Sequence, residues 1–422
     1  MKHDRQVRPG RQTFARPRTG DHAIFIYEDT AALFRFAAPY INDGLAKGER
    51  CVYLAADSSP AEILEALSAH GVRTSREVKR GALAVTTARE FFGFPFNAPR
   101  AMEHMLRTGT EAASAGFAGL RVAGDWAWSL EKSVQDNELG EFESLLERAT
   151  APSRLTLACM YRRDHTDPGT LERLIRLHTK VIASDYVFVS MSALFRSLPP
   201  KDLQSLAKSA RQRVIRKGEF FFHQGAPARD VYMLTSGMVK LVRTAPGGES
   251  VILRVVAPVQ HFGDGRIGLG EAVRFAAAEA LEDSRALVWD SSAIGEVVLA
   301  HPAVGVNVIR WLQELMEEER TRLEDFLSAD VKRRLARLFL RLGQSIGRKT
   351  RRGVVINVPL SRRDLAELVI TSPYTISRIL AEWRRLDILD AQRTRIRIQD
   401  GEQLAAIAEQ PVPGSDVASR IS

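Results

Sequence analysis

The sequence predicts a multidomain chain of α/β and α+β type. An α/β domain comes first, followed by an antiparallel β domain, a long helix and a small C-terminal domain with two short helices. The chain has 422 residues, more than one domain normally holds, and 45% of them are hydrophobic. Strand-like and helix-like runs alternate up to about residue 190, and short strands broken by glycines follow. In the C-terminal part, apolar residues recur at helical spacing and arginines are frequent between them.

The N-terminal α/β domain is expected over residues 20–190, after a basic, disordered tail at 1–19. The tail lacks the apolar stretch of a secretion signal. Five runs are apolar along their whole length, as in buried parallel strands: AIFIYE, RCVYLAA, ALAVTT, GLRVAGDW and RLTLACMYRR. The helix expected between the first and second of these runs has one apolar face, formed by Leu33, Phe36, Ala37, Tyr40 and Ile41. Strands that alternate with helices indicate helices on both faces of a parallel sheet.

An antiparallel β-roll or sandwich is expected over residues 191–300. The runs KGEFFFHQG, RDVYMLTSGMVKLVRT and GGESVILRVVAPVQHFGD are short and are interrupted by glycines at turn spacing. A long helix then spans residues 301–328. Apolar residues recur along it at intervals of three and four, as in a coiled coil: Ile309, Leu312, Met316, Leu323 and Phe326. We expect this seam to hold a homodimer.

A helix-turn-helix with a β wing is expected over residues 329–404, before a tail at 405–422. Ser361 caps the first helix and Asp364 completes a capping box, whereas Ser372 caps the second helix and Pro373 opens it. Four residues give the second helix a buried face: Ile376, Ile379, Leu380 and Trp383. Ile and Arg alternate in ILDAQRTRIRIQDGEQL, as in a β-hairpin.

Positive charge is concentrated in this C-terminal domain. Between Val331 and Asp400 there are 17 Lys and Arg against 6 Asp and Glu, a net charge of +11. The whole chain carries +9, so the remainder sums to −2. A basic domain that contains a helix-turn-helix pattern indicates binding to the phosphates of double-stranded DNA.

Residues 193–403 resemble the Crp/Fnr family of transcription regulators. The resemblance rests on FFFHQGAPARDVYMLTSGMVKLVR, which is similar to the family's β-roll, and on LSRRDLAELVITSPYTISRIL, which is similar to its DNA-binding signature. It implies a homodimer that binds a palindromic operator, and contact with RNA polymerase if the protein is an activator. The residues expected to contact DNA are Ser372, Tyr374, Thr375, Ser377, Arg378, Arg362, Arg395 and Arg397.

Two departures from the family pattern change these expectations. Tyr374 replaces the family's glutamate, so a different operator sequence is expected. Ile370 stands where the family's turn has glycine, and a β-branched residue at positive φ is strained, so we expect a different turn.

The β-roll carries an altered form of the family's cyclic-nucleotide cassette. Gly263 and Asp264 replace the pair Gly-Glu, and Arg274 is followed by Phe275 instead of a hydroxyl residue. Arg274 could hold a phosphate, but Asp264 is shorter than glutamate and Phe275 removes a donor. We therefore expect a roll that is empty or filled by its own side chains.

Residues 20–182 resemble the MEDS sensory domain, through HAIFIYED, INDGLAKGERCVYLAAD, GFAGLRVAGDWAW, CMYRRD and LIRLHTKVI. The resemblance implies a RecA/KaiC-like fold and an unidentified small-molecule effector. Ligands of parallel α/β domains bind at the carboxyl ends of the strands. The expected pocket rim on that basis is His22, Tyr27, Asp57, Arg121, Asp125, Trp126 and Tyr161.

Other chemistry is poorly supported by the sequence. No phosphate-binding loop with Lys-Ser/Thr follows a strand, and there is no HExxH, paired zinc CxxC or nucleophile elbow. We expect no enzyme, cofactor, metal or membrane span, and the apolar settings of the two cysteines, Cys51 and Cys159, are consistent with the cytoplasm. Two alternatives stay open: a nucleotide-handling ATPase domain tethered to DNA, and an N-terminal scaffold for a protein partner.

Overall fold

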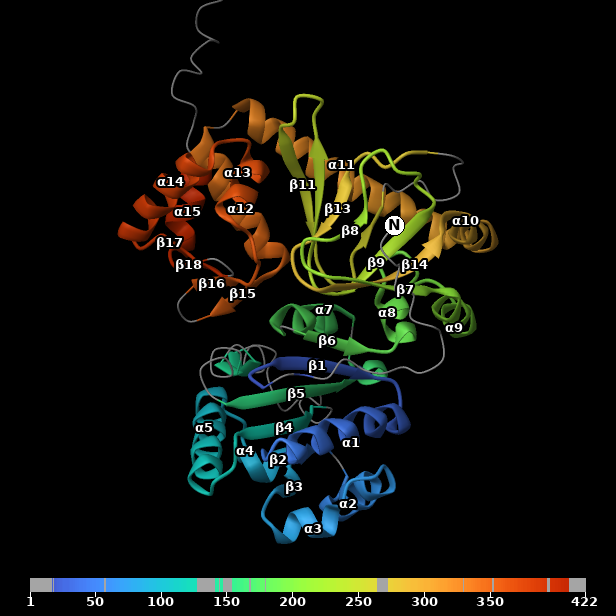
Figure 1. Cartoon of the computed structure of the whole chain (residues 1–422), viewed down its shortest axis with the longest axis vertical. Coiled ribbons are helices and arrows are strands. Elements are labelled where there is room, and N and C mark those ends of the chain that lie inside the picture. The colour runs from blue at the N-terminus through green and yellow to red at the C-terminus, as the bar shows by residue number, and fades with distance from the viewer. Residues whose placement is uncertain are drawn as a thin grey trace, which may run out of the picture. The chain divides into compact units, whose positions relative to one another are not determined.

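The computed structural model describes residues 17, 19–56, 58–126, 141–143, 145–146, 154–166, 168–178, 180–263, 272–328, 330–350, 353–392 and 395–409. The chain forms two compact units, and the boundary between them along the sequence lies between Phe188 and Val189 (Figure 1). Three expected site residues fall outside this description: Asp57, Asp264 and the side chain of Phe326.

The N-terminal unit contains a six-stranded parallel sheet in the order β3-β2-β4-β5-β1-β6 (Figure 1). Its strands are β1 (His22–Tyr27), β2 (Arg50–Ala55), β3 (Leu83–Thr87), β4 (Leu120–Asp125), β5 (Leu155–Arg162) and β6 (Lys180–Ala183). The first five agree with the predicted runs, and their residues are mostly buried, as both faces of the sheet are covered. The edge strand β6 is an additional strand that the sequence analysis does not predict.

The first two helices of this unit begin at side-chain caps. Asp29 accepts a hydrogen bond from the Ala32 amide at the start of α1, and Ser59 forms a capping box with Glu62 at the start of α2. The helices are α1 (Thr30–Ala46), α2 (Pro60–Ala69), α3 (Thr74–Lys79), α4 (Ala88–Phe92), α5 (Ala98–Ser114), α7 (Pro168–Leu177) and α8 (Asp185–Met191), which crosses the unit boundary. A 3-10 turn, η2, covers Arg163–His165.

The two faces of this sheet have different surroundings. On one face, α1 and α2 pack against alternate strand residues such as Phe25, Tyr53 and Met160. The five residues predicted for the apolar face of α1 are all buried there. The opposite face carries His22 and Leu157, which are partners in the register of β1 and β5. The buried polar residues discussed below lie on this second face.

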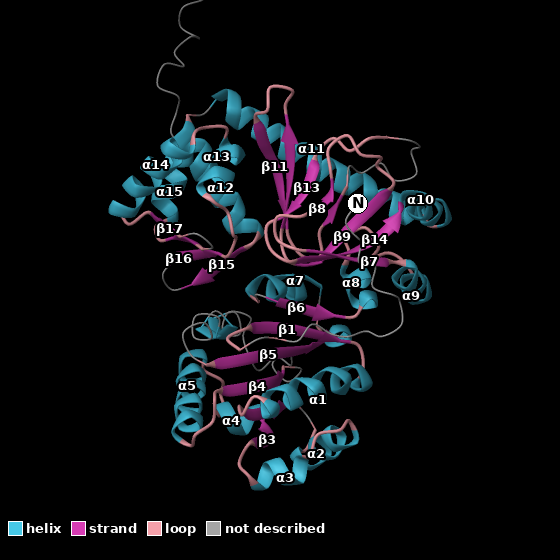
Figure 2. Cartoon of the chain, in the orientation of Figure 1, coloured by secondary structure: helices cyan, strands magenta, loops and turns pink. Residues whose placement is uncertain are grey.

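The second unit opens with α9 (Pro200–Ser209) and a β-roll of two four-stranded antiparallel sheets (Figure 2). One sheet has the order β11-β10-β13-β8 and the other β12-β9-β14-β7. The strands are β7 (Arg211–Ile215), β8 (Phe220–Phe222), β9 (Asp230–Ser236), β10 (Val239–Thr244), β11 (Ser250–Val256), β12 (His261–Phe262), β13 (Ala277–Ala280) and β14 (Ser284–Asp290). Aromatic side chains, including Phe221, Tyr232 and Phe262, fill the space between the sheets.

Two helices follow the roll: α10 (Ser291–Ala300) and the long α11 (Pro302–Ser328). Three apolar residues of the predicted seam are exposed on α11 in the single chain: Ile309 at 58%, Met316 at 73% and Leu323 at 58%. Leu312 is half-buried. Within the described residues, no helix combines the length and the apolar character that a membrane span requires.

The C-terminal part of this unit combines helices with a small antiparallel sheet, β15-β16-β18-β17 (Figure 2). Its elements are α12 (Val331–Ser345), β15 (Gly347–Thr350), β16 (Gly353–Ile356), α13 (Arg362–Val369), α14 (Pro373–Arg385), β17 (Leu389–Ala391), β18 (Ile396–Ile398) and α15 (Gly401–Glu409). Phe339 and Trp383 meet in its core, which also contacts Leu281 of the roll. This packing positions α13 and α14 as the predicted pair of short helices.

Candidate nucleic-acid interface

The helix α14 presents one apolar and one polar face. Ile376, Ile379, Leu380 and Trp383 are buried in the domain core, as their spacing predicts. Tyr374 is 78% exposed, and Ser377 and Arg378 are exposed beside it. Because the buried face fixes the rotation of the helix, these polar residues must face away from the core. This is the geometry by which a recognition helix offers side chains to a DNA groove.

Hydroxyl groups at the start of α14 already have local partners. The Ser372 hydroxyl accepts a hydrogen bond from the Thr375 amide at 3.1 Å, and the hydroxyl groups of these two residues lie 2.9 Å apart. Ser377 donates its hydroxyl proton to the carbonyl oxygen of Pro373 at 2.9 Å. A hydroxyl that donates its proton within the helix can still accept. The Ser377 oxygen can therefore accept a further hydrogen bond.

Arg378 differs from these hydroxyl residues. Its guanidinium makes no hydrogen bond or ion pair with any residue in the described part of the chain. The five N–H donors of an arginine side chain suit the O6 and N7 acceptors of guanine, or a phosphate. Arg378 could therefore bind a ligand without giving up a hydrogen bond or ion pair to any described residue.

The turn before α14 corrects one expectation. Ile370 adopts the left-handed conformation, with φ of 53°, so the prediction of a different backbone at this position is wrong. The Thr371 amide bonds to the Ala366 carbonyl at 3.0 Å, and Arg334 Nε donates to the Val369 carbonyl at 3.0 Å. A non-glycine residue in this region costs about 1–2 kcal/mol. The surrounding hydrogen bonds hold the turn despite that strain.

The wing is the hairpin of β17 and β18. Ile396 and Ile398 are buried, whereas Arg397 between them is half-buried on the other face, as the Ile-Arg alternation predicts. Arg395 is also half-buried. Arg362 donates from Nη2 to the Ala391 carbonyl at 2.8 Å, and burial lowers the pKa of its guanidinium. Arg362 thus holds the wing to α13, and its contact with DNA stays a prediction.

In the described part of the β-roll cassette, Arg274 and Phe275 contact other residues of the protein. Arg274 is buried, donates from Nη2 to the Asp230 carbonyl at 2.6 Å and lies 4.2 Å from the centre of the Phe222 ring. A Cβ atom at Gly263 would lie 2.8 Å from Arg274 Nη1. Phe275 is exposed, with the Arg243 guanidinium 3.6 Å from its ring centre. The arginine that would hold a cyclic phosphate is therefore committed to backbone and aromatic partners.

Comparison with known proteins agrees with this order of domains. Residues 21–179 match the MEthanogen/methylotroph, DcmR Sensory domain (MEDS), residues 212–301 the cyclic nucleotide-binding domain, and residues 333–407 the Crp-like helix-turn-helix domain. This chain is a DNA-binding transcription regulator of the Crp/Fnr type. Its second half is joined to an N-terminal MEDS domain, which fits signal sensing.

Two relatives illustrate the similarity of this Crp/Fnr-type regulator. It is 25% identical over 217 residues to the CRP-like cAMP-activated global transcriptional regulator of Mycobacterium tuberculosis, which covers 51% of this chain and 96% of the relative. It is 28% identical over 189 residues to the cyclic AMP receptor protein of Thermus thermophilus, with 45% and 84% covered. A solved mutant of CooA from Carboxydothermus hydrogenoformans matches with a TM-score of 0.42 and 20% identity, covering 49% of this chain and 90% of that one.

In the MEDS domain of this regulator, two expected rim residues come together. The Tyr27 hydroxyl donates to the Asp125 carboxylate, with both oxygens at 3.1 Å, and the two residues end β1 and β4. Burial, together with the Asp125 charge, raises the pKa of Tyr27 well above its usual value. Trp126 follows Asp125 and packs against Phe92 and Phe142 in an aromatic cluster.

The expected position of two other rim residues is corrected. His22 begins β1 and Arg121 is the second residue of β4, so both lie at the amino ends of their strands. The guanidinium of Arg121 is buried, 2.5 Å from Glu49 Oε2 and 3.1 Å from Asp43 Oδ2. The prediction assigned both residues to the carboxyl ends of their strands, although each stands near the start of its apolar run in the sequence. It was therefore wrong about the edge of the sheet on which they lie.

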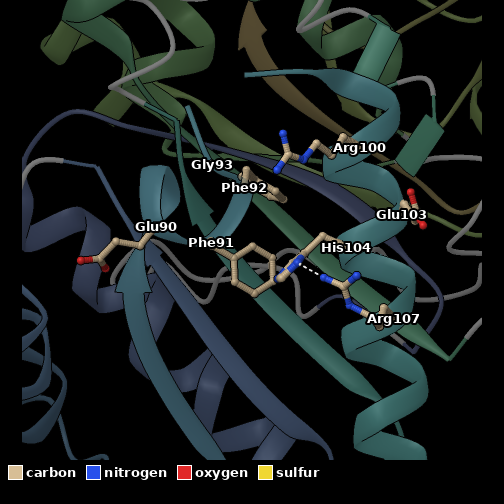
Figure 3. Close-up of a pocket in the computed structure, with 8 residues that line it drawn as sticks. All are labelled: Glu90, Phe91, Phe92, Gly93, Arg100, Glu103, His104 and Arg107. Atoms are coloured by element: carbon tan, nitrogen blue, oxygen red, sulfur yellow. Dashed lines mark hydrogen bonds between the residues drawn. The ribbon is translucent and has the colours of Figure 1, made fainter. Parts of the chain in front are cut away.

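A pocket of about 350 Å³ lies elsewhere on the MEDS domain (Figure 3). Its lining joins α4 to α5 and includes none of the expected rim residues: Glu90, Phe91, Phe92, Gly93, Arg100, Glu103, His104 and Arg107. Arg107 Nη2 lies 2.7 Å from His104 Nδ1, and burial together with the Arg107 charge lowers the pKa of His104 (Figure 3). A neutral imidazole in this setting can accept the hydrogen bond from Arg107.

Sequence reasoning missed Glu143, which contacts two expected rim residues. Its Oε2 lies 2.9 Å from His22 Nε2, and its Oε1 accepts a hydrogen bond from the Tyr161 hydroxyl at 2.7 Å. His22 and Tyr161 therefore share a buried partner on the second face of the sheet. No short motif connects these residues, because His22 and Glu143 are far apart in the chain. The topology of the sheet is the only signal that unites them.

Proposed function

We propose that this regulator reads a palindromic operator through α14 as a homodimer. The observation that carries the proposal is Arg378, exposed and without a partner in the described residues, on a helix whose opposite face is buried. Two such helices, one from each protomer, would reach half-sites about one turn of DNA apart, roughly 34–36 Å. Tyr374, Thr375 and Ser377 would contribute to the choice of base, and the wing arginines would contact phosphate.

The homodimer would form along α11. Ile309, Met316 and Leu323 are spaced by seven residues and are exposed in the single chain. Apolar residues in such a repeat favour pairing with a second helix of the same kind. A change in the packing of this helix pair would alter the distance between the two recognition helices. If the protein is an activator, it would also contact RNA polymerase.

The signal would enter through the N-terminal domain, whose proposed limits are residues 20–190. An all-parallel sheet covered by helices supports a RecA/KaiC-like domain, and such sheets bind ligands at their carboxyl ends. Arg274 already contacts Asp230 and Phe222, which supports a structural role for the β-roll over a role in ligand binding. In this role the protein acts on DNA in the cytoplasm and does not turn over nucleotide.

Selection of DNA from a random pool would test the DNA-reading role. The purified full chain should enrich a two-fold symmetric sequence, which then serves as the probe for affinity measurements. Arg378→Ala should weaken binding to that probe by about 1–3 kcal/mol at fixed salt, because a bidentate base contact is lost. Binding to unrelated DNA should change much less.

A matched control replaces one arginine of the N-terminal unit and so removes one positive charge away from α14. Arg107→Ala, on α5 of the MEDS domain, should leave the affinity for the operator unchanged. Equal affinity of the Arg378→Ala and wild-type proteins would exclude α14 as the proposed reading element. Failure of the wild-type protein to enrich any sequence would contradict the proposal as a whole.

A further inference from the structure

Four buried side chains converge on the second face of the N-terminal sheet. They are His22 on β1, Cys159 on β5, Glu143 in the helical residues 141–143, and His178 directly after α7. Each offers one atom of the kind that binds a metal ion, and these four atoms all lie within 4.8 Å of one another. β1 is far from the other three segments in the chain, and the sheet brings His22 beside them.

The distances within the cluster approach those of a tetrahedral coordination shell. Glu143 Oε2 lies 2.9 Å from His22 Nε2 and 3.2 Å from His178 Nε2. Cys159 Sγ lies 3.3 Å from His22 Nε2 and 3.6 Å from Glu143 Oε2. Zinc bonds of about 2.0–2.3 Å in a tetrahedron place neighbouring ligand atoms about 3.3–3.8 Å apart. Small outward shifts of the side chains would therefore make room for an ion at the centre.

The orientation of His178 is set from outside the cluster. Its Nδ1 lies 2.7 Å from the Leu174 carbonyl oxygen, which can only accept, so Nδ1 carries a proton. In the neutral imidazole the lone pair is then on Nε2, the atom that points into the cluster. This Nε2 atom is buried and lies 3.2 Å from Glu143 Oε2. An outer carbonyl that fixes a histidine in this way is typical of metal ligands.

A second outer contact orients the carboxylate. The Tyr161 hydroxyl donates to Glu143 Oε1 at 2.7 Å and leaves Oε2 directed toward the histidines and the cysteine. All four cluster residues are buried. A closed set of four ligands, without a position open to water, is the arrangement of structural zinc sites. Nitrogen and sulfur ligands favour zinc over magnesium or calcium, which prefer oxygen.

We propose that His22, Glu143, Cys159 and His178 form a closed binding site for one zinc-like divalent cation within the sensory domain. The ion would join β1, β5, the helical residues 141–143 and the segment after α7. A shared ion would therefore fix the helical residues 141–143 to the sheet. Binding would therefore stabilise the folded domain over the unfolded chain.

Cobalt(II) is the probe that tests this site, since it replaces zinc and reports its ligands by absorbance. Full-length protein is first stripped with a chelator and then titrated with Co²⁺. We expect saturation at one ion per chain, intense visible bands of a tetrahedral ion and a near-ultraviolet charge-transfer band from a thiolate ligand. Added Zn²⁺ should displace the cobalt and abolish these bands.

The two cysteines of the chain make a matched pair of variants. Cys51 is also buried in this sheet but is not part of the cluster. Cys51→Ser should keep the thiolate band, whereas Cys159→Ser should lose it and His178→Gln should bind Co²⁺ at least tenfold more weakly. If Cys159→Ser fails to fold, the thiolate band in the Cys51→Ser protein alone assigns the ligand, because only Cys159 remains.

Three results would overturn the proposal. The first is wild-type protein that contains no zinc and develops no cobalt bands, which would leave the cluster as a metal-free ion pair. The second is a cobalt spectrum without a thiolate band. The third is a thiolate band that persists in Cys159→Ser and disappears in Cys51→Ser.

Discussion

Lys240 Nζ lies 2.7 Å from Asp364 Oδ1, and this ion pair joins β10 of the roll to the first turn of α13. Glu279 on β13 lies 3.3 Å from the same ammonium group. The side chains of Lys240 and Asp364 are only 12% and 10% exposed, so water screens the pair weakly. Asp364 also completes the capping box of α13 with Ser361. One carboxylate thus supports both the start of a DNA-binding helix and its contact with the roll.

We predict that Lys240→Met destabilises this unit by about 1–3 kcal/mol, because it leaves the Asp364 carboxylate buried without its partner. Urea unfolding at pH 7 measures the effect. Lys217→Met, at an exposed lysine of the same roll, should change the free energy of unfolding by less than about 0.5 kcal/mol. An equal loss in both variants would show that the ion pair contributes nothing specific.

Acid should remove the contribution of the Lys240–Asp364 ion pair to the free energy of unfolding. Burial alone would raise the pKa of Asp364, but hydrogen bonds from Lys240 and Ser361 lower it overall. A carboxylate with a lowered pKa in the folded state stabilises above its unfolded pKa of about 3.9, and this is lost as the pH falls through the folded pKa. The difference between wild type and Lys240→Met should therefore shrink below about pH 4. A difference that stays constant down to pH 2 would contradict this assignment.

The assembly proposed for α11 can be tested by placing charges in its seam. We predict that Leu312→Asp combined with Met316→Asp makes the protein monomeric, because each carboxylate would be buried against the partner helix. Sedimentation velocity measures the change, and operator affinity should fall with it. Gln313→Asp combined with Glu317→Asp introduces the same residue at exposed positions of α11 and should leave the dimer intact. A double seam variant that remains dimeric would place the interface elsewhere.

Cyclic nucleotides should have little effect on the roll. A ligand that binds only the folded state stabilises it by about 2.7 kcal/mol at a hundredfold excess over Kd. Because Arg274 is bonded to Asp230 and covered by Phe222, we predict no change in melting temperature with cyclic AMP. Calorimetry of the full chain provides the measurement. A clear shift that disappears in Arg274→Lys would return the sensing role to the roll.

Arg121 should matter for stability. We predict that Arg121→Met destabilises the N-terminal unit by about 3–5 kcal/mol, since Glu49 and Asp43 lose their buried cation. Adding Glu49→Gln to Arg121→Met should recover part of the loss, as one uncompensated charge is removed. Urea unfolding of Arg121→Met, of Glu49→Gln and of the double variant measures this coupling. Purely additive effects in the double variant would contradict the buried ion pair seen at 2.5 Å between Arg121 Nε and Glu49 Oε2.

The features that could be predicted from the sequence depend on interactions between residues close together in the chain. The caps at Ser59, Ser361 and Ser372 act within three residues, so they are visible in the sequence and present in the structure. The strand β6 has only four residues, too few for a pattern of alternation or continuous burial. The contacts of Glu143 with His22 and of Lys240 with Asp364 join distant parts of the chain. Their partners depend on sheet order and domain packing, which no spacing in the sequence reveals.

The place of β1 in its sheet affects how this protein is made. β1 is the first strand to be synthesised, yet its neighbours are β5 and β6, the last two strands of the sheet. Ala23 pairs with Ala158 on one side and with Lys180 on the other. At about 5–20 residues per second, a ribosome needs on the order of 10 s to supply these partners. Throughout that interval the apolar segment AIFIY lacks its partner strands and is exposed to aggregation with other nascent chains. We therefore expect the binding of a chaperone during translation to raise the yield of folded protein.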